Sequence, residues 1–127
     1  MIAALLLAAT QAALSPPPVA DWDRLPAFPV PRAADIVDGA AFVRGEIESG
    51  HCHPVPAPAT GGVRLIAPVA ILVGPTGIVR QIVPQAIGCP TIEQYTVGYL
   101  LSLTRTGAGA APSPEPGWYR LVVSYRW

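Results

Sequence analysis

The chain has 127 residues, with eight basic and eight acidic side chains, so its formal net charge is zero. A neutral chain lacks the basic excess that is typical of nucleic-acid-binding proteins, and we therefore expect no nucleic-acid partner. All eight basic residues are arginine, which excludes a P-loop lysine and a Schiff-base lysine. With 51% hydrophobic residues the chain is too apolar to be disordered, and its length fits one domain.

An uncharged apolar run, Ile2 to Ala9, opens the sequence. A bilayer span needs about 20 residues, so this run is too short to cross a membrane, but it has the length of the apolar part of a secretory signal. Thr10-Gln11-Ala12 offers small residues at the two positions that signal peptidase reads. We predict a cleavable signal peptide over residues 1–12. The alternatives are an apolar helix that packs on the domain, or a start codon assigned slightly late, because no basic residue precedes the run.

A proline-rich segment, residues 13–32, follows the predicted signal. Its prolines favour an extended, polyproline-like linker. Three large apolar side chains of this segment are available to dock on the domain surface, namely Trp22, Leu25 and Phe28. The folded domain is expected to cover residues 33–127.

Two helices are predicted. The first begins with Asp35 as a plausible N-cap and ends at Gly50. Its apolar side chains recur at helical spacing, at Ile36, Ala40, Val43 and Ile47. The second begins at Pro90, because proline suits the first position of a helix. Its apolar stripe consists of Ile92, Tyr95, Tyr99, Leu100 and Leu103.

Three strands are predicted from side chains that alternate with a period of two. The first covers Val63–Val73, and the turn Gly74–Gly77 joins it to the second, Ile78–Val83. In the third, residues 118–127, one face points to the core and consists of Tyr119, Leu121, Val123, Tyr125 and Trp127. We therefore predict an α+β domain with a three-stranded antiparallel sheet and two packed helices. The order of elements is helix, strand, strand, helix, strand.

The two cysteines, Cys52 and Cys89, indicate the redox environment. In an oxidising compartment, an even pair in a small domain usually forms a disulfide. Closing a loop of roughly 37 residues stabilises a fold by about 4 kcal/mol in the chain-entropy model. We predict a Cys52–Cys89 disulfide, with two reduced, buried thiols as the alternative.

Taken in order, these segments resemble the C-terminal domain of TonB, the periplasmic energy transducer of Gram-negative bacteria. The matching pieces are Gly62-Val63, the strand VRLIAPVAILV, the turn GPTG, the strand IVRQIV, Gly88, the helix from Pro90 and the closing strand LVVSYRW. The resemblance covers residues 33–127 and implies a periplasmic protein-binding domain. His53-Pro54 stands where the family has Tyr-Pro, and neither cysteine belongs to the family pattern. The sequence shows no membrane anchor or long spacer, so we expect the fold to carry over without force transmission.

The last strand is the predicted binding surface. A long strand at the edge of a small sheet has free backbone groups that can pair with an added strand. The TonB-like family is understood to bind receptor segments in this way, and some members dimerise through it. We predict a non-catalytic module that pairs an extended peptide or partner chain, such as an outer-membrane receptor segment, along this edge. The predicted edge residues are Trp118, Arg120, Val122, Ser124 and Arg126. The alternative is a structural envelope protein that self-associates, for example as a homodimer, through the same strand.

No catalytic site, metal site or cofactor is predicted. His51-Cys52-His53 is the only cluster of potential metal ligands in the sequence, and a disulfide would remove its thiolate. No serine lies in a nucleophile-elbow motif. Glu46 and Glu48 lie two residues apart on the first predicted helix, so their side chains point to different faces. A small hydrolase or metalloprotein remains as a third hypothesis, and only the His-Cys-His triplet favours it.

Overall fold

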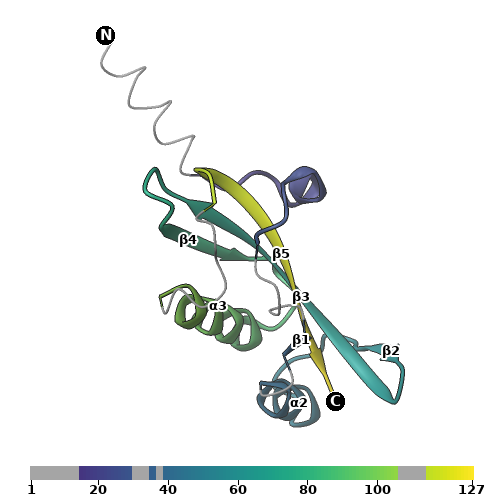
Figure 1. Ribbon diagram of the computed structural model, residues 1–127. Coiled ribbons are helices and arrows are strands. Elements are labelled where there is room, and N and C mark those ends of the chain that lie inside the picture. Colours follow the sequence, from purple (N-terminus) through teal and green to yellow (C-terminus); the bar gives the residue numbers. More distant parts are fainter. Residues whose placement is uncertain (1–14, 30–34, 37–38, 106–113) are drawn as a thin grey trace, which may run out of the picture.

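A computed structural model describes residues 15–29, 35–36, 39–105 and 114–127 (Figure 1). The helices of this part are the 3-10 helix η1 (Val19–Arg24), α2 (Ala40–Glu48) and α3 (Pro90–Arg105). Its strands are β1 (Asp35–Ile36), β2 (Ala57–Ala59), β3 (Gly62–Val73), β4 (Val79–Pro84) and β5 (Gly117–Arg126). None of the helices in the described ranges is long and apolar enough to cross a membrane.

β3 is the central strand of a five-stranded sheet. It pairs antiparallel with β5 along Arg64–Val73. On its other side, β3 pairs antiparallel with β2 at one end and with β4 at the other end. β1 pairs in parallel with β5, near the C-terminal end of that strand. The predicted α+β class is confirmed. The sheet has more than the predicted three strands. The predicted order omits β1 and β2, because two or three residues are too few to show a period, and it omits η1, which lies in the predicted linker.

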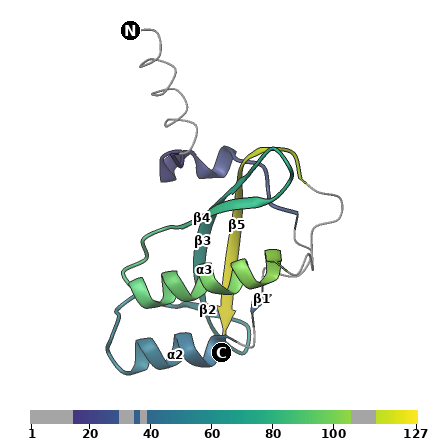
Figure 2. The same ribbon diagram turned by 90° about the vertical axis from the view of Figure 1, so that its left-hand side faces the viewer.

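The core lies between the sheet and the two α-helices. Figure 2 shows α3 crossing the strands and α2 lying beside it, while η1 contacts β5 from the opposite face (Figure 1). The alternating residues of β3 that face the helices are all buried, namely Leu65, Ala67, Val69, Ile71 and Val73. They pack with Val43 of α2, with Ile92 and Leu100 of α3, and with Val123 and Tyr125 of β5.

Glycine meets a backbone requirement near each end of β3. The turn between β3 and β4 is closed by hydrogen bonds from Gly74 N–H to the carbonyl of Ile78 (2.8 Å) and from Gly77 N–H to the carbonyl of Gly74 (3.0 Å). Gly77 has φ +78°, a conformation that suits glycine. At the other end of β3, a Cβ atom at Gly62 would collide with the main-chain carbonyl of Trp127. The chain therefore requires glycine where the C-terminal end of β5 closes against β3.

The start of the first α-helix differs from the prediction. α2 begins at Ala40 with Gly39 as its N-cap, and Asp35 instead belongs to β1. The N-cap pattern at Asp35 does not set the start of the helix, because this part of the backbone pairs with β5. The predicted end is confirmed, since Gly50 has φ +80° and its N–H donates to the carbonyl of Ile47 at 3.1 Å. α3 begins at Pro90 as predicted.

The hydroxyl of Tyr125 is buried in the core, where it lies 2.7 Å from Oγ1 of Thr96. Burial raises the pKa of Tyr125 to about 12, against the opposing effect of the Thr96 hydrogen bond. Between about pH 10 and this value the unfolded chain has released the tyrosine proton while the folded chain still holds it, so stability falls as pH rises. We expect this tyrosine to account for a loss of up to about 3 kcal/mol across that window. Urea unfolding of the wild type and Tyr125→Phe measures it, and parallel pH profiles would contradict the assignment.

Candidate functional site

The outer edge of β5 pairs with the chain's own N-terminal segment. Arg120 N–H donates to the carbonyl of Pro26 (2.9 Å), and Phe28 N–H donates to the carbonyl of Arg120 (2.8 Å). The Arg120 side chain adds a third bond, from Nε to the carbonyl of Leu25 at 2.9 Å. Ala27 therefore forms a parallel bridge with Arg120. β5 accepts an extended, proline-containing segment along this edge.

Two buried aromatic side chains anchor this segment. Phe28 is only 5% exposed and packs edge-on against Tyr119, with the ring centroids 5.9 Å apart. Trp22 of η1 is also buried, and its Nε1 donates to the carbonyl of Pro17 at 2.9 Å. Residues 15–29 of the predicted linker are thus docked on the domain, through two of the three side chains that were available for docking.

A cleft of about 240 Å³ lies beside the same edge, between η1 and the sheet. Its apolar lining consists of Val19, Trp22, Pro68, Val69, Leu121 and Val122. Asp23 and Arg120 bring one charge of each sign to its wall, and Gln85 adds an amide. The cleft can therefore hold an apolar side chain next to a polar or charged group.

The predicted edge residues differ in their accessibility. Arg120 and Val122 line the cleft, and Val122 is exposed. Trp118 is half-buried near the start of β5. Ser124 is buried, and it pairs with β1 at Asp35. The structure thus brings Arg120 and Val122 together at one open site and places Ser124 where a ligand does not reach its side chain.

Arg126 lies at the far end of β5, directly opposite Arg64 of β3. Like charges at directly opposed positions are unfavourable in a sheet. Nε of Arg64 is buried and has no hydrogen-bond partner within the described part of the chain. Ile66, the next residue of β3 on the same face, is exposed. This end of the outer face is therefore both basic and apolar.

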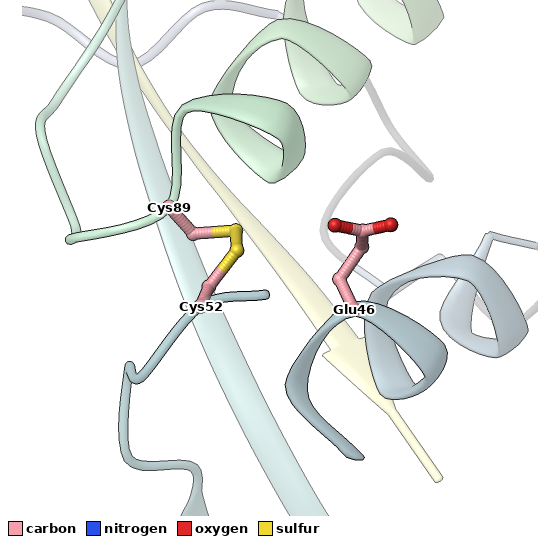
Figure 3. Close-up of side chains that lie close together, drawn as sticks. All are labelled: Glu46, Cys52 and Cys89. Atoms are coloured by element: carbon pink, nitrogen blue, oxygen red, sulfur yellow. A yellow bond between two sulfur atoms is a disulfide. The ribbon is translucent and has the colours of Figure 1, made fainter. Parts of the chain in front are cut away.

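The predicted disulfide is confirmed. Cys52 and Cys89 are bonded, their Cα atoms lie 5.1 Å apart, and both residues are buried. Figure 3 shows Glu46 projecting from α2 beside the disulfide. The hydroxyl of Thr91 lies 3.3 Å from Sγ of Cys89 and donates to Oε2 of Glu46 at 2.9 Å. The Glu46 carboxylate also lies 3.4 Å from Nδ1 of His51.

Sequence reasoning missed this polar cluster, because Glu46 and Thr91 lie 45 residues apart and neither stands in a motif. The predicted divergence of the two glutamates is seen, since Glu48 pairs with Arg44 at 2.8 Å on the solvent side. Among the described residues, Glu46, Cys52 and Cys89 are the one group of three potential metal ligands. The disulfide engages both sulfur atoms of that group, so the oxidised chain cannot use them to hold an ion.

The outer edge of β5 and the polar cluster around the disulfide are thus the two candidate functional sites in the described part of the chain. No protein family, curated protein or solved structure matches this chain.

Proposed function

We propose that this protein is a non-catalytic binding module that pairs an extended peptide or a partner chain with the outer edge of β5. The observation that carries the proposal is the pairing of Arg120 with both Pro26 and Phe28. Both the N–H and the carbonyl of Arg120 form hydrogen bonds with the extended segment, which is the backbone pairing that strand addition requires. The chain's own segment thus occupies the place that a partner would take.

The contacts of this segment suggest the chemistry of the partner. A displacing peptide would have to replace the aromatic contact of Phe28 with Tyr119 and the carbonyls that face Arg120. An extended segment with one aromatic residue makes these contacts. Prolines in it lose no hydrogen bond at positions where only the backbone carbonyl pairs with β5. The cleft next to Arg120 would receive a further apolar side chain. We therefore propose an extended, aromatic-containing partner segment.

The resemblance of residues 33–127 to the TonB C-terminal domain supports the same mode of binding. With it we propose a periplasmic location in a Gram-negative cell envelope and, as the partner, a segment of an outer-membrane receptor. The buried Cys52–Cys89 disulfide suits an oxidising compartment. The predicted signal peptide, residues 1–12, lies outside the described residues.

A fluorescent peptide with the sequence of residues 24–30, RLPAFPV, tests the proposal directly. In the wild type the tethered segment competes at an effective concentration in the millimolar range, so the free peptide binds weakly. Phe28→Ala weakens the tethered competitor, and we expect fluorescence anisotropy to show at least about tenfold tighter peptide binding to this variant. The peptide RLPAAPV, which lacks the aromatic side chain, serves as the control and should not bind.

Equal peptide affinity in the wild type and Phe28→Ala would overturn the proposal. Sedimentation of the same variant tests the alternative function, self-association. Exchange of the N-terminal segment between two copies would give a mass that rises with concentration even without peptide. Such a result, with no peptide binding, would identify a second copy as the partner.

A further inference from the structure

Three potential metal ligands lie together where the disulfide joins the segment after α2 to the start of α3 (Figure 3). The ligand atoms of Glu46, Cys52 and Cys89 all lie within 4.8 Å of one another. Nδ1 of His51 lies 3.4 Å from Oε2 of Glu46. Two sulfurs, one carboxylate and one imidazole form a ligand set that zinc prefers.

The Glu46 carboxylate is partly buried and has no arginine partner among the described residues. Its side chain is only 16% exposed, yet its contacts are the neutral hydroxyl of Thr91 and the imidazole of His51. Arg44 of the same helix pairs with Glu48 instead, and no arginine of the described ranges forms an ion pair with Glu46. Buried carboxylates are normally paired with a cation or coordinate a metal ion. Glu46 is therefore a partly buried carboxylate without an arginine partner, a position that suits a metal ligand.

The disulfide alone withholds the two sulfurs from this set. A dithiol reductant would convert it to two thiols, and the reductant would leave as its own disulfide. The thiol sulfurs would then move apart to van der Waals contact, close to the separation of about 3.8 Å that two sulfurs have on tetrahedral zinc. Nitrogen and oxygen ligands on the same ion lie about 3.3 Å apart. The 3.4 Å between His51 and Glu46 fits that separation.

We infer that the reduced chain binds one zinc-class divalent cation through Cys52, Cys89, Glu46 and His51, and that oxidation of the cysteines excludes the ion. Binding releases the two thiol protons. Exchange with a disulfide oxidant, which takes up the two electrons and leaves as a dithiol, restores the Cys52–Cys89 bond and expels the metal. His51 is 69% exposed and is free to turn toward the ion. Thr91 keeps its hydrogen bond to the carboxylate and orients Glu46. The disulfide thus links the segment after α2 to the start of α3 in the oxidised chain, and the metal ion takes over that link in the reduced chain.

The test uses the full chain, reduced anaerobically with a water-soluble phosphine, which takes the oxygen of one water as its two hydrogens pass to the sulfurs. After removal of the phosphine, the chain is titrated with Co²⁺ alone and then with Zn²⁺. We expect the oxidised chain to bind no ion. The reduced chain should bind one Co²⁺ with a sulfur-to-cobalt charge-transfer band, which Zn²⁺ then abolishes. Glu46→Gln and His51→Ala should each weaken zinc binding at least about tenfold.

His53→Ala is the matched control, because His53 also neighbours Cys52 but, unlike His51, forms no ion pair with Glu46 within the described ranges. It should bind zinc like the wild type. Equal losses in His51→Ala and His53→Ala, or unchanged binding in Glu46→Gln, would overturn the inference. Circular dichroism covers the case in which reduction unfolds the chain: zinc should then restore the native spectrum in the wild type but not in Glu46→Gln. Zinc bound without that recovery would also overturn it.

Discussion

Phe28→Ala is expected to lower the free energy of unfolding by about 3 to 5 kcal/mol, the range for removing a buried phenylalanine. The side chain is buried against Tyr119, although it comes from a proline-rich segment that local sequence patterns assign to a linker. Its loss removes apolar burial and also weakens the two backbone bonds with Arg120. Urea unfolding followed by tryptophan fluorescence measures the change.

The matched control is Phe42→Ala, which truncates the other phenylalanine of the chain. Phe42 is 41% exposed and stacks on Tyr95 with the ring centroids 4.6 Å apart. Because the ring is already partly in water, we expect a loss of about 1 kcal/mol. A larger loss in Phe42→Ala than in Phe28→Ala would show that the N-terminal segment is only loosely attached to β5.

Removing the disulfide should have an effect of similar size. The double substitution Cys52→Ala and Cys89→Ala opens a loop with a sequence separation of 37. The chain-entropy model then predicts a loss of about 4 kcal/mol, a large share of the roughly 5 to 15 kcal/mol that stabilises a typical domain. The bridge matters here because it connects the segment after α2 to the start of α3, and few other contacts join these helices.

Denaturant unfolding of the oxidised wild type and of the double variant tests this expectation. Chemically reduced, zinc-free wild type is the internal control, since it lacks the bond but keeps both side chains. We expect it to match the double variant closely. A difference below about 1 kcal/mol between the oxidised wild type and the double variant would contradict the chain-entropy account.

The parts of the fold that follow local patterns could be predicted from the sequence. Alternation identified β3 and β5, the glycines identified the turn at Gly74–Gly77, and Pro90 identified the start of α3. The disulfide also followed from composition, because two cysteines leave one possible pair. In each case the signal lies within a few residues or in a residue count.

The parts that depend on distant pairing could not be predicted. Asp35 has the features of an N-cap, but the parallel contact with β5 decides its conformation. The prolines of the N-terminal segment indicate a linker, yet Pro26 needs only its carbonyl to bond with Arg120. Glu46 was predicted only to point to a different helix face from Glu48, and only the fold brings it to Thr91. Parallel pairing and polar clusters across the chain leave no periodic trace in the sequence.

Amide hydrogen exchange at Arg120 tests most directly whether the outer edge of β5 can exchange its own segment for a partner. The Arg120 N–H points to Pro26, whereas the Leu121 N–H points to β3, so the two amides report opposite edges of one strand. In Phe28→Ala we expect exchange to accelerate more at Arg120 than at Leu121, and added RLPAFPV peptide to slow Arg120 again. Equal acceleration at both amides, with no effect of the peptide, would contradict the account.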